Sequence, residues 1–272
     1  MDKFNAINEA ICYWLGYQFK IGRDKLIHEA SLRYPIADTI TATNIEIAKI
    51  QLEKGHPCFS DRLVDLFLYD KPVTEISEEN LMSSIAEIYE LKLAKKETGT
   101  KGGQENQRVV DDILRLAYFN QTTGKDSYFL ICGKYQNFKN YFVGQKDKPQ
   151  TDKDENILIK ERLTSIATAN EWNPQDSLYK EYFDFELSKT PKSYIFNKNE
   201  ILESDGEDEK KRKQFGLNSF QDRYKIKDGL ITWSDSITIK TTCIALTPFE
   251  SITHRTHACG IWKIEVSRPK IG

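Results

Sequence analysis

The chain of 272 residues contains no apolar run long enough to cross a bilayer. Its first twenty residues lack the basic region, apolar stretch and small-residue cleavage site of a signal peptide, so we expect none. It also lacks a basic excess, because 39 Lys and Arg residues against 41 Asp and Glu residues give a net charge of −2. We therefore expect no membrane partner, and any contact with nucleic acid has to come from a local patch.

The cysteines are few and form no C-x-x-C pair. There are five, an odd number, scattered from Cys12 to Cys259. This pattern is typical of reduced thiols rather than of a disulfide framework, so we expect a cytoplasmic protein. A hydrophobic content of 39% is enough for a substantial core.

Hydrophobic periodicity predicts a mixed α/β order for the first half of the chain. Asp24 is the predicted N-cap of a second helix, and Pro35 is expected to end that helix near Tyr34. The tripeptide Gly55-His56-Pro57 predicts a turn between two strands. The predicted elements are helices at 3–20, 24–34 and 105–120, and strands at 45–53, 62–69, 85–94 and 127–133.

The second half of the chain is harder to interpret from its pattern. Residues 145–155 read as a surface linker and 202–213 as a solvated charge run. Two strands are predicted near the end, at 237–247 and 259–266. We therefore divide the chain into a core at 1–144 and an α+β extension at 145–272, whose strands pack on or join the same sheet.

Three residues on two predicted strands carry the strongest chemical signal. Glu90 and Lys92 are two apart on an alternating strand, so both project from one face. Asp65 lies on the preceding strand, the expected antiparallel neighbour. Two carboxylates on adjacent strands can hold one Mg²⁺ or Mn²⁺ ion, and Lys92 can act on a water beside it. The competing interpretation is a strand that carries a structural salt bridge.

The Asp strand, the E-x-K strand and the helix after them resemble the PD-(D/E)XK, or restriction-endonuclease-like, nucleases over residues 20–140. The resemblance implies a three-layer αβββαβ core with a mixed sheet. It also implies that Asp65 and Glu90 are metal ligands and that Lys92 is the catalytic lysine, with Glu29 in the place of a further acidic ligand. Val64 stands where the family motif has proline.

Several other residues could contact a nucleic acid beside such a site. The predicted basic loop at 95–104 carries Lys95, Lys96 and Lys101, which could contact phosphates. Gln107, near the start of the next helix, could also reach the site. Asp112 and Arg115, three apart on that helix, are interpreted as an intrahelical ion pair.

The expected function is a metal-dependent nuclease that hydrolyses phosphodiester bonds in anti-phage defence or restriction. We expect DNA as the substrate, and the sequence leaves RNA open. The helix lacks the Gln-x-x-x-Tyr signature of RecB-like exonucleases, which argues against an exonuclease of that type, and the choice between endo and exo action stays open. Whether the protein forms a homodimer or binds a partner protein of a defence system is left open. The alternative is a catalytically inactive binding or scaffold module that keeps the nuclease fold. A third possibility is an α/β interaction protein in which the three residues form a salt-bridge network.

Overall fold

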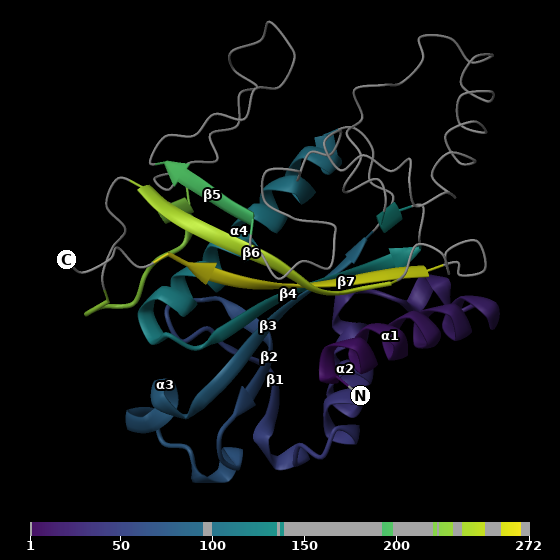
Figure 1. Cartoon of the computed structure of the whole chain (residues 1–272), viewed down its shortest axis with the longest axis horizontal. Helices are drawn as coiled ribbons and strands as arrows, with labels where there is room; N and C mark the ends of the chain where they lie inside the picture. The colour runs from purple at the N-terminus through teal and green to yellow at the C-terminus, as the bar shows by residue number, and fades with distance from the viewer. Residues whose placement is uncertain are drawn as a thin grey trace, which may run out of the picture.

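The structure is a computed structural model that combines helices with one mixed sheet (Figure 1). It describes residues 2–94, 100–134, 137–138, 192–197, 220–221, 223–230, 236–247 and 257–267. The predicted linker at 145–155 and the predicted charged loop at 202–213 lie outside these residues. No described helix is both long enough and apolar enough to cross a membrane.

The helices and strands follow one another along the chain in an α/β order. The α-helices are α1 (Lys3–Lys20), α2 (Glu29–Ala42), α3 (Leu81–Ser84) and α4 (Thr100–Thr123). Short 3-10 helices cover Asp24–Leu26, Ile47–Lys49, Val73–Glu75 and Glu78–Asn80. The strands are β1 (Ile50–Gly55), β2 (Leu63–Tyr69), β3 (Ile85–Ala94), β4 (Asp126–Lys134), β5 (Lys192–Asn197), β6 (Ser236–Leu246) and β7 (His257–Val266).

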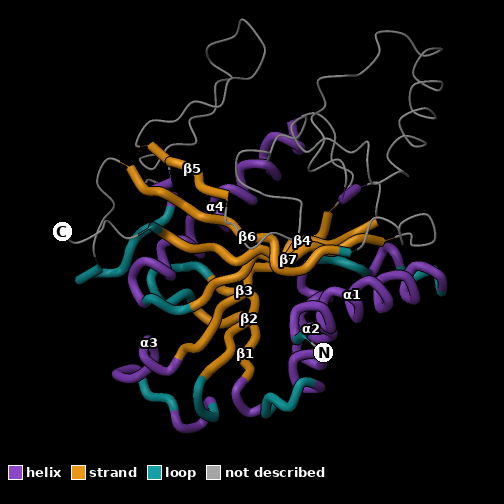
Figure 2. Tube along the Cα trace, viewed as in Figure 1, coloured by secondary structure: helices purple, strands orange, loops and turns teal. Residues whose placement is uncertain are grey.

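The seven strands form one sheet in the order β1-β2-β3-β4-β7-β6-β5 (Figure 2). Among these strands, β3 and β4 form the parallel pair, and the other neighbours are antiparallel. Parallel neighbours need a crossover connection, and α4 provides it. Strands β6 and β7, which come from the predicted extension, join the same sheet as β1 to β4.

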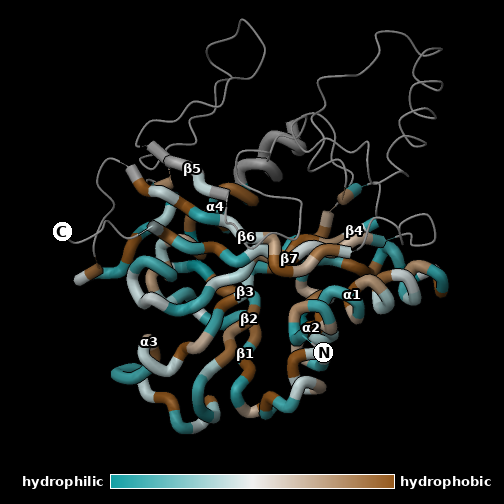
Figure 3. Tube along the Cα trace, viewed as in Figure 1, coloured by the Kyte–Doolittle hydropathy of each residue, from teal (hydrophilic) through white to brown (hydrophobic). Residues whose placement is uncertain are grey.

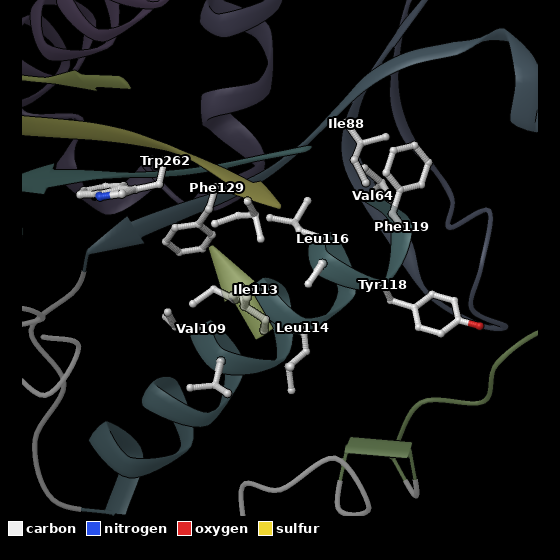
Figure 4. Packing of buried hydrophobic residues seen from close by; sticks show 14 of the residues in the cluster. Val64, Ile88, Val109, Ile113, Leu114, Leu116, Tyr118, Phe119, Phe129 and Trp262 are labelled. Atoms are coloured by element: carbon white, nitrogen blue, oxygen red, sulfur yellow. The ribbon is translucent and has the colours of Figure 1, made fainter. Parts of the chain in front are cut away.

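Helices cover both faces of the sheet. One cluster of buried side chains joins α4 to the sheet, and Figure 4 shows Ile113 and Leu116 of α4 directed toward Phe129 of β4. A second cluster joins α1 and α2 to the opposite face, where Ile11 and Leu130 are fully buried. In Figure 3 hydrophobic and hydrophilic segments alternate along α1, as expected of a helix with one buried stripe.

The prediction for α1 is confirmed, but the prediction for the second helix is wrong. Asp24 begins a 3-10 turn, and the helix starts only at Glu29, after a capping box between His28 and Ser31. Pro35 lies inside the helix rather than at its end. Leu32, Ile36 and Ile40 are fully buried on that helix. Their burial outweighs the backbone hydrogen bond that Pro35 cannot donate.

The predicted strands at 62–69, 85–94, 127–133, 237–247 and 259–266 are confirmed within a few residues. The strand predicted at 45–53 begins only at Ile50, because residues 47–49 form a 3-10 turn. The loop predicted at 95–104 is wrong in its second half, since α4 already begins at Thr100.

Candidate functional site

Three acidic residues occupy neighbouring positions on the first three strands. The pairing of β1 with β2 places Glu53 opposite Asp65, between the pairs Leu52–Leu66 and Lys54–Val64. The pairing of β2 with β3 starts at Leu66 and Tyr89, so one further step places Asp65 opposite Glu90. The register therefore places three acidic residues in one row of backbone positions across the sheet, with Glu53 in a left-handed conformation at φ 51°.

Asp65 lies between a guanidinium and a backbone amide. Arg33, on α2, donates to Asp65 Oδ1 from Nε at 3.0 Å and from Nη2 at 2.5 Å. The Leu91 amide donates to Oδ2 at 2.8 Å, so both oxygens accept hydrogen bonds. Arg33 Nη1 also lies 2.5 Å from Glu53 Oε1. A single arginine therefore bridges the first two carboxylates of the row.

Glu90 is buried, with 4% of its surface exposed. Its side chain is within hydrogen-bonding reach of the Asp65 carboxyl group. Arg115 Nη2 lies 3.0 Å from Glu90 Oε1, yet that oxygen has no well-aligned hydrogen bond to any residue that the structure describes. Burial raises the pKa of Glu90 well above its ordinary value. The Arg115 guanidinium opposes this rise, and the Asp65 and Asp112 carboxylates add to it.

Lys92 is buried to the same degree as Glu90 and lies between two acidic side chains. Its Nζ is 3.4 Å from Oε1 of Glu29, the first residue of α2. The second contact is with Oδ2 of Asp112 at 3.9 Å. Lys92 and Glu90 both belong to the face of β3 that carries Ile88 and Ala94, which pack in the α4 cluster. Glu29, predicted as a third metal ligand, is thus a partner of Lys92.

The pair Asp112 and Arg115 on α4 is the intrahelical ion pair that the sequence predicts, with Nη2 and Oδ1 2.5 Å apart. What the prediction missed is the contact of the same guanidinium with Glu90. The pKa of Arg115 is raised: its burial lowers it, but the Glu90 and Asp112 carboxylates outweigh that effect. The sequence held a signal for such a contact. In the segment VVDDILRLAYF, apolar residues surround the charged ones, which predicts that the charged residues are buried and need partners.

A segment from the predicted extension also contacts this region. Asp111, next to the ion pair and buried, accepts hydrogen bonds from Arg223 Nη2 at 2.6 Å and from the Tyr224 hydroxyl at 3.0 Å. The Tyr224 ring lies 5.7 Å from the Arg115 guanidinium carbon. Residues 223–224 therefore pack against the charged part of α4, although more than 100 positions separate them in the chain.

The residues predicted to contact nucleic acid are only partly placed. Lys95 and Lys96 lie outside the described residues. Lys101 and Gln107 fall within α4, so Lys101 belongs to a helix rather than to the predicted loop.

The described residues contain no group of three or more His, Cys, Asp or Glu side chains arranged to hold a metal ion. What they do contain is the close pair Asp65 and Glu90. Mg²⁺ is often held by one or two carboxylates, with water and substrate phosphate completing its six positions. The crowding of two acidic groups, with one buried Glu90 oxygen lacking a well-aligned hydrogen bond, fits a hard cation of this kind.

Comparisons with protein-family models, with curated proteins and with solved structures find no match for this chain.

Proposed function

We propose that the protein is a divalent-metal-dependent nuclease of the PD-(D/E)XK type, with DNA as its substrate, in anti-phage defence or restriction. The observation that carries the proposal is the juxtaposition of Asp65 and Glu90 across two neighbouring strands, with Lys92 on the same face of β3. The order of helices and strands around them, with α4 as the crossover between parallel strands, supports the same family.

The charge balance of the site supports a divalent cation. Among the residues that the structure describes, the ion pairs around Asp65, Glu90 and Lys92 join five carboxylates to three cationic side chains. Burial and the neighbouring carboxylates raise the pKa of Glu90, so its ionised form is costly at this place. A single Mg²⁺ or Mn²⁺ held by Asp65 and Glu90 would favour the ionised form of Glu90.

Each side chain then has a distinct task. Asp65 and Glu90 would hold the metal, which when bound lowers the pKa of a water and offsets charge on the phosphoryl oxygens. Lys92 would orient the attacking water and stabilise the negative charge that develops on the phosphate. Glu29 and Asp112 flank its ammonium group and fix its position. Arg115 would favour the ionised form of Glu90.

A salt-bridge network is the second candidate, because Asp65 and Glu90 each lie against an arginine. In that case the protein is a structural or binding module, which keeps the arrangement without cleaving. The two candidates differ in metal binding. A nuclease site takes Mn²⁺ and a satisfied ion-pair network does not.

The test combines cleavage with calorimetric Mn²⁺ titration. Plasmid, linear duplex, single-stranded DNA and RNA are incubated with the protein, with and without Mn²⁺. We expect Asp65→Asn to lose both cleavage and metal affinity, because it removes a charged ligand. Lys92→Ala should lower cleavage by roughly 10² or more while Mn²⁺ affinity holds or rises.

Exposed residues provide the matched controls. Asp61→Asn and Lys54→Ala repeat the two chemical changes at exposed positions, and both should cleave like the wild type. Wild-type protein that binds no Mn²⁺ and cleaves none of the substrates would favour the ion-pair network. Loss of metal binding in Lys92→Ala as severe as in Asp65→Asn would make the lysine structural.

A further inference from the structure

A groove beside the carboxylate row is formed by α1, α2 and β1. Its volume is about 590 Å³, within the range of ordinary ligand sites. Aromatic, cationic and acidic side chains line it together, among them Trp14, His28, Arg33, Tyr34 and Glu53. Tyr34 is 70% exposed and lines the groove, so its side chain is accessible to a ligand there.

Arg33 belongs both to this groove and to the proposed metal site. It lines the groove, and its guanidinium donates twice to Asp65 Oδ1 while it pairs with Glu53. The guanidinium thus neutralises the carboxylate that a metal would bind. A divalent cation at Asp65 has to compete with Arg33 for that oxygen, because both positive groups need the same negative charge.

Phosphate is the chemical group best suited to draw Arg33 away. A guanidinium matches the paired oxygens of phosphate as well as it matches those of a carboxylate. Trp14 and Tyr34 add rings on which nucleobases can stack, and His28 adds a group that can donate to a phosphate oxygen. The groove therefore suits a strand of nucleic acid, with a phosphate at Arg33 and a base against the rings.

We infer that Arg33 couples nucleic-acid binding in the groove to metal binding at Asp65. A phosphodiester group in the groove takes the guanidinium, releases Asp65 Oδ1 and thereby raises the affinity of Asp65 and Glu90 for the metal. The metal site is therefore complete only when the substrate is present, so the protein binds metal weakly without substrate. This inference rests on the proposed nuclease function and assigns the groove and Arg33 a role in it.

The experiment measures Mn²⁺ affinity by calorimetry, with and without a short oligodeoxynucleotide made with non-hydrolysable phosphate linkages. In the wild type the oligonucleotide should tighten Mn²⁺ binding at least about fivefold, the lower end of typical coupling between two sites. Arg33→Gln should bind Mn²⁺ more tightly than the wild type when no oligonucleotide is present, and the oligonucleotide should add little further. Arg23→Gln removes the same charge from an exposed position that does not line the groove, and it should behave like the wild type.

Arg33→Lys provides a second variant that keeps the charge. A lysine cannot make the two-donor contact with Asp65 while it also reaches Glu53, so the coupling should shrink without disappearing. Thermal unfolding of each variant shows which proteins are folded, and Arg33→Lys decides the question if Arg33→Gln does not fold.

Two outcomes overturn the inference alone. One is wild-type coupling retained in folded Arg33→Gln or Arg33→Lys, and the other is Mn²⁺ binding in Arg33→Gln that is no tighter than in the wild type. A third outcome concerns the ligand of the groove. If inorganic phosphate tightens Mn²⁺ binding as strongly as the oligonucleotide at equal phosphate concentration, the groove is not assigned to a nucleic-acid strand. Wild-type protein that takes no Mn²⁺ under any condition overturns the proposed function itself, and the inference with it.

Discussion

The two faces of the sheet bury polar groups of different kinds. Under α4, the buried side chains include Glu90, Lys92 and Asp111 among apolar neighbours. Under α1 and α2, the buried polar groups include the Asn8 amide, the His257 imidazole and the Thr247 hydroxyl, which bonds to Cys259. They also include thiols such as Cys132 and Cys259, which lie opposite each other on β4 and β7. One sheet therefore supports a charged core on one side and a nearly uncharged core on the other.

The two faces differ in how much their buried polar groups reduce the stability of the fold. A buried thiol behaves as a small hydrophobic group, whereas a buried charge costs several kcal/mol unless a partner compensates for it. Apolar residues in the place of these charged ones would reduce the stability of the fold less, as the apolar packing under α1 illustrates. A charged core on one face alone is the distribution expected if that face carries the chemistry.

The largest expected effect comes from breaking the charged core. Arg115→Met removes the cation that Glu90 and Asp112 share, so the buried Glu90 carboxylate loses this partner and Asp112 keeps the longer contact with Lys92. We expect the free energy of unfolding to fall by about 3–5 kcal/mol. Urea denaturation monitored by circular dichroism measures this loss.

A concerted variant sharpens the same comparison. Glu90→Gln, Asp112→Asn and Arg115→Met together remove all three charges and should recover most of that stability, while Glu90→Gln removes a proposed metal ligand and should abolish metal binding. A triple variant as unstable as Arg115→Met would mean that the charges themselves stabilise the fold.

The next effect tests whether apolar packing is equal on the two faces. Ile11 belongs to α1 and Ile113 to α4, and both are at most 2% exposed. Replacing either with alanine should cost about 2–5 kcal/mol, because both changes leave a cavity in a packed core. Urea denaturation of the two variants gives the numbers. A loss below about 1 kcal/mol at one position would show that this face is loosely packed.

A smaller loss is expected from overpacking β7. A Cβ at Gly260 would lie 2.3 Å from Cη2 of the Trp262 ring, which is fully buried in the α4 core. Gly260→Ala should therefore cost about 1–3 kcal/mol, measured by thermal and urea unfolding. Gly55→Ala on β1 is the matched control, since a Cβ there meets nothing within 4 Å. Equal effects at the two glycines would show that the Trp262 ring moves aside freely.

Acid should weaken both cores. Burial, and then Lys134, lower the pKa of His257 to about 4 from an ordinary 6.5, and burial also lowers the pKa of His56. Below pH 6.5 the unfolded chain therefore binds protons that the folded state does not, so stability falls as the pH drops from 6.5 toward 4. His257→Gln should remove a part of this loss on the order of 1–2 kcal/mol, allowing for solvent screening.

Urea denaturation at a series of pH values measures that slope. His28→Gln changes an exposed histidine and is the control. A slope identical in His257→Gln and the wild type would assign the acid sensitivity to other groups.

The smallest effect is expected at a surface ion pair. Lys263 Nζ lies 2.9 Å from Asp126 Oδ1, and the Asp126 side chain is 43% exposed. Lys263→Met should change the free energy of unfolding by less than about 1 kcal/mol, in contrast to the buried pairs around Glu90. A loss comparable to that of Arg115→Met would erase the distinction between surface and buried charges in this protein.

The strands were predictable because their signals are local. Residues 85–94 alternate in polarity and residues 66–69 form a continuous apolar run, and both patterns lie on strands of the fold, β3 and β2. The alternation alone also placed Glu90 and Lys92 on one face. The errors fall where a tertiary contact outweighs a local signal, as at Pro35, where a buried face keeps the helix intact across the proline.

The sequence by itself therefore determined the α/β class, most of the strands, and the carboxylates and lysine that share neighbouring strands. Only the tertiary structure decided that β7 lies beside β4, that Arg33 bridges Glu53 and Asp65, and that Arg115 reaches Glu90. The physical reason is separation along the chain. Periodicity within a window of ten residues reports which face is buried, whereas the partner of a charge 25 or more positions away depends on how whole elements pack.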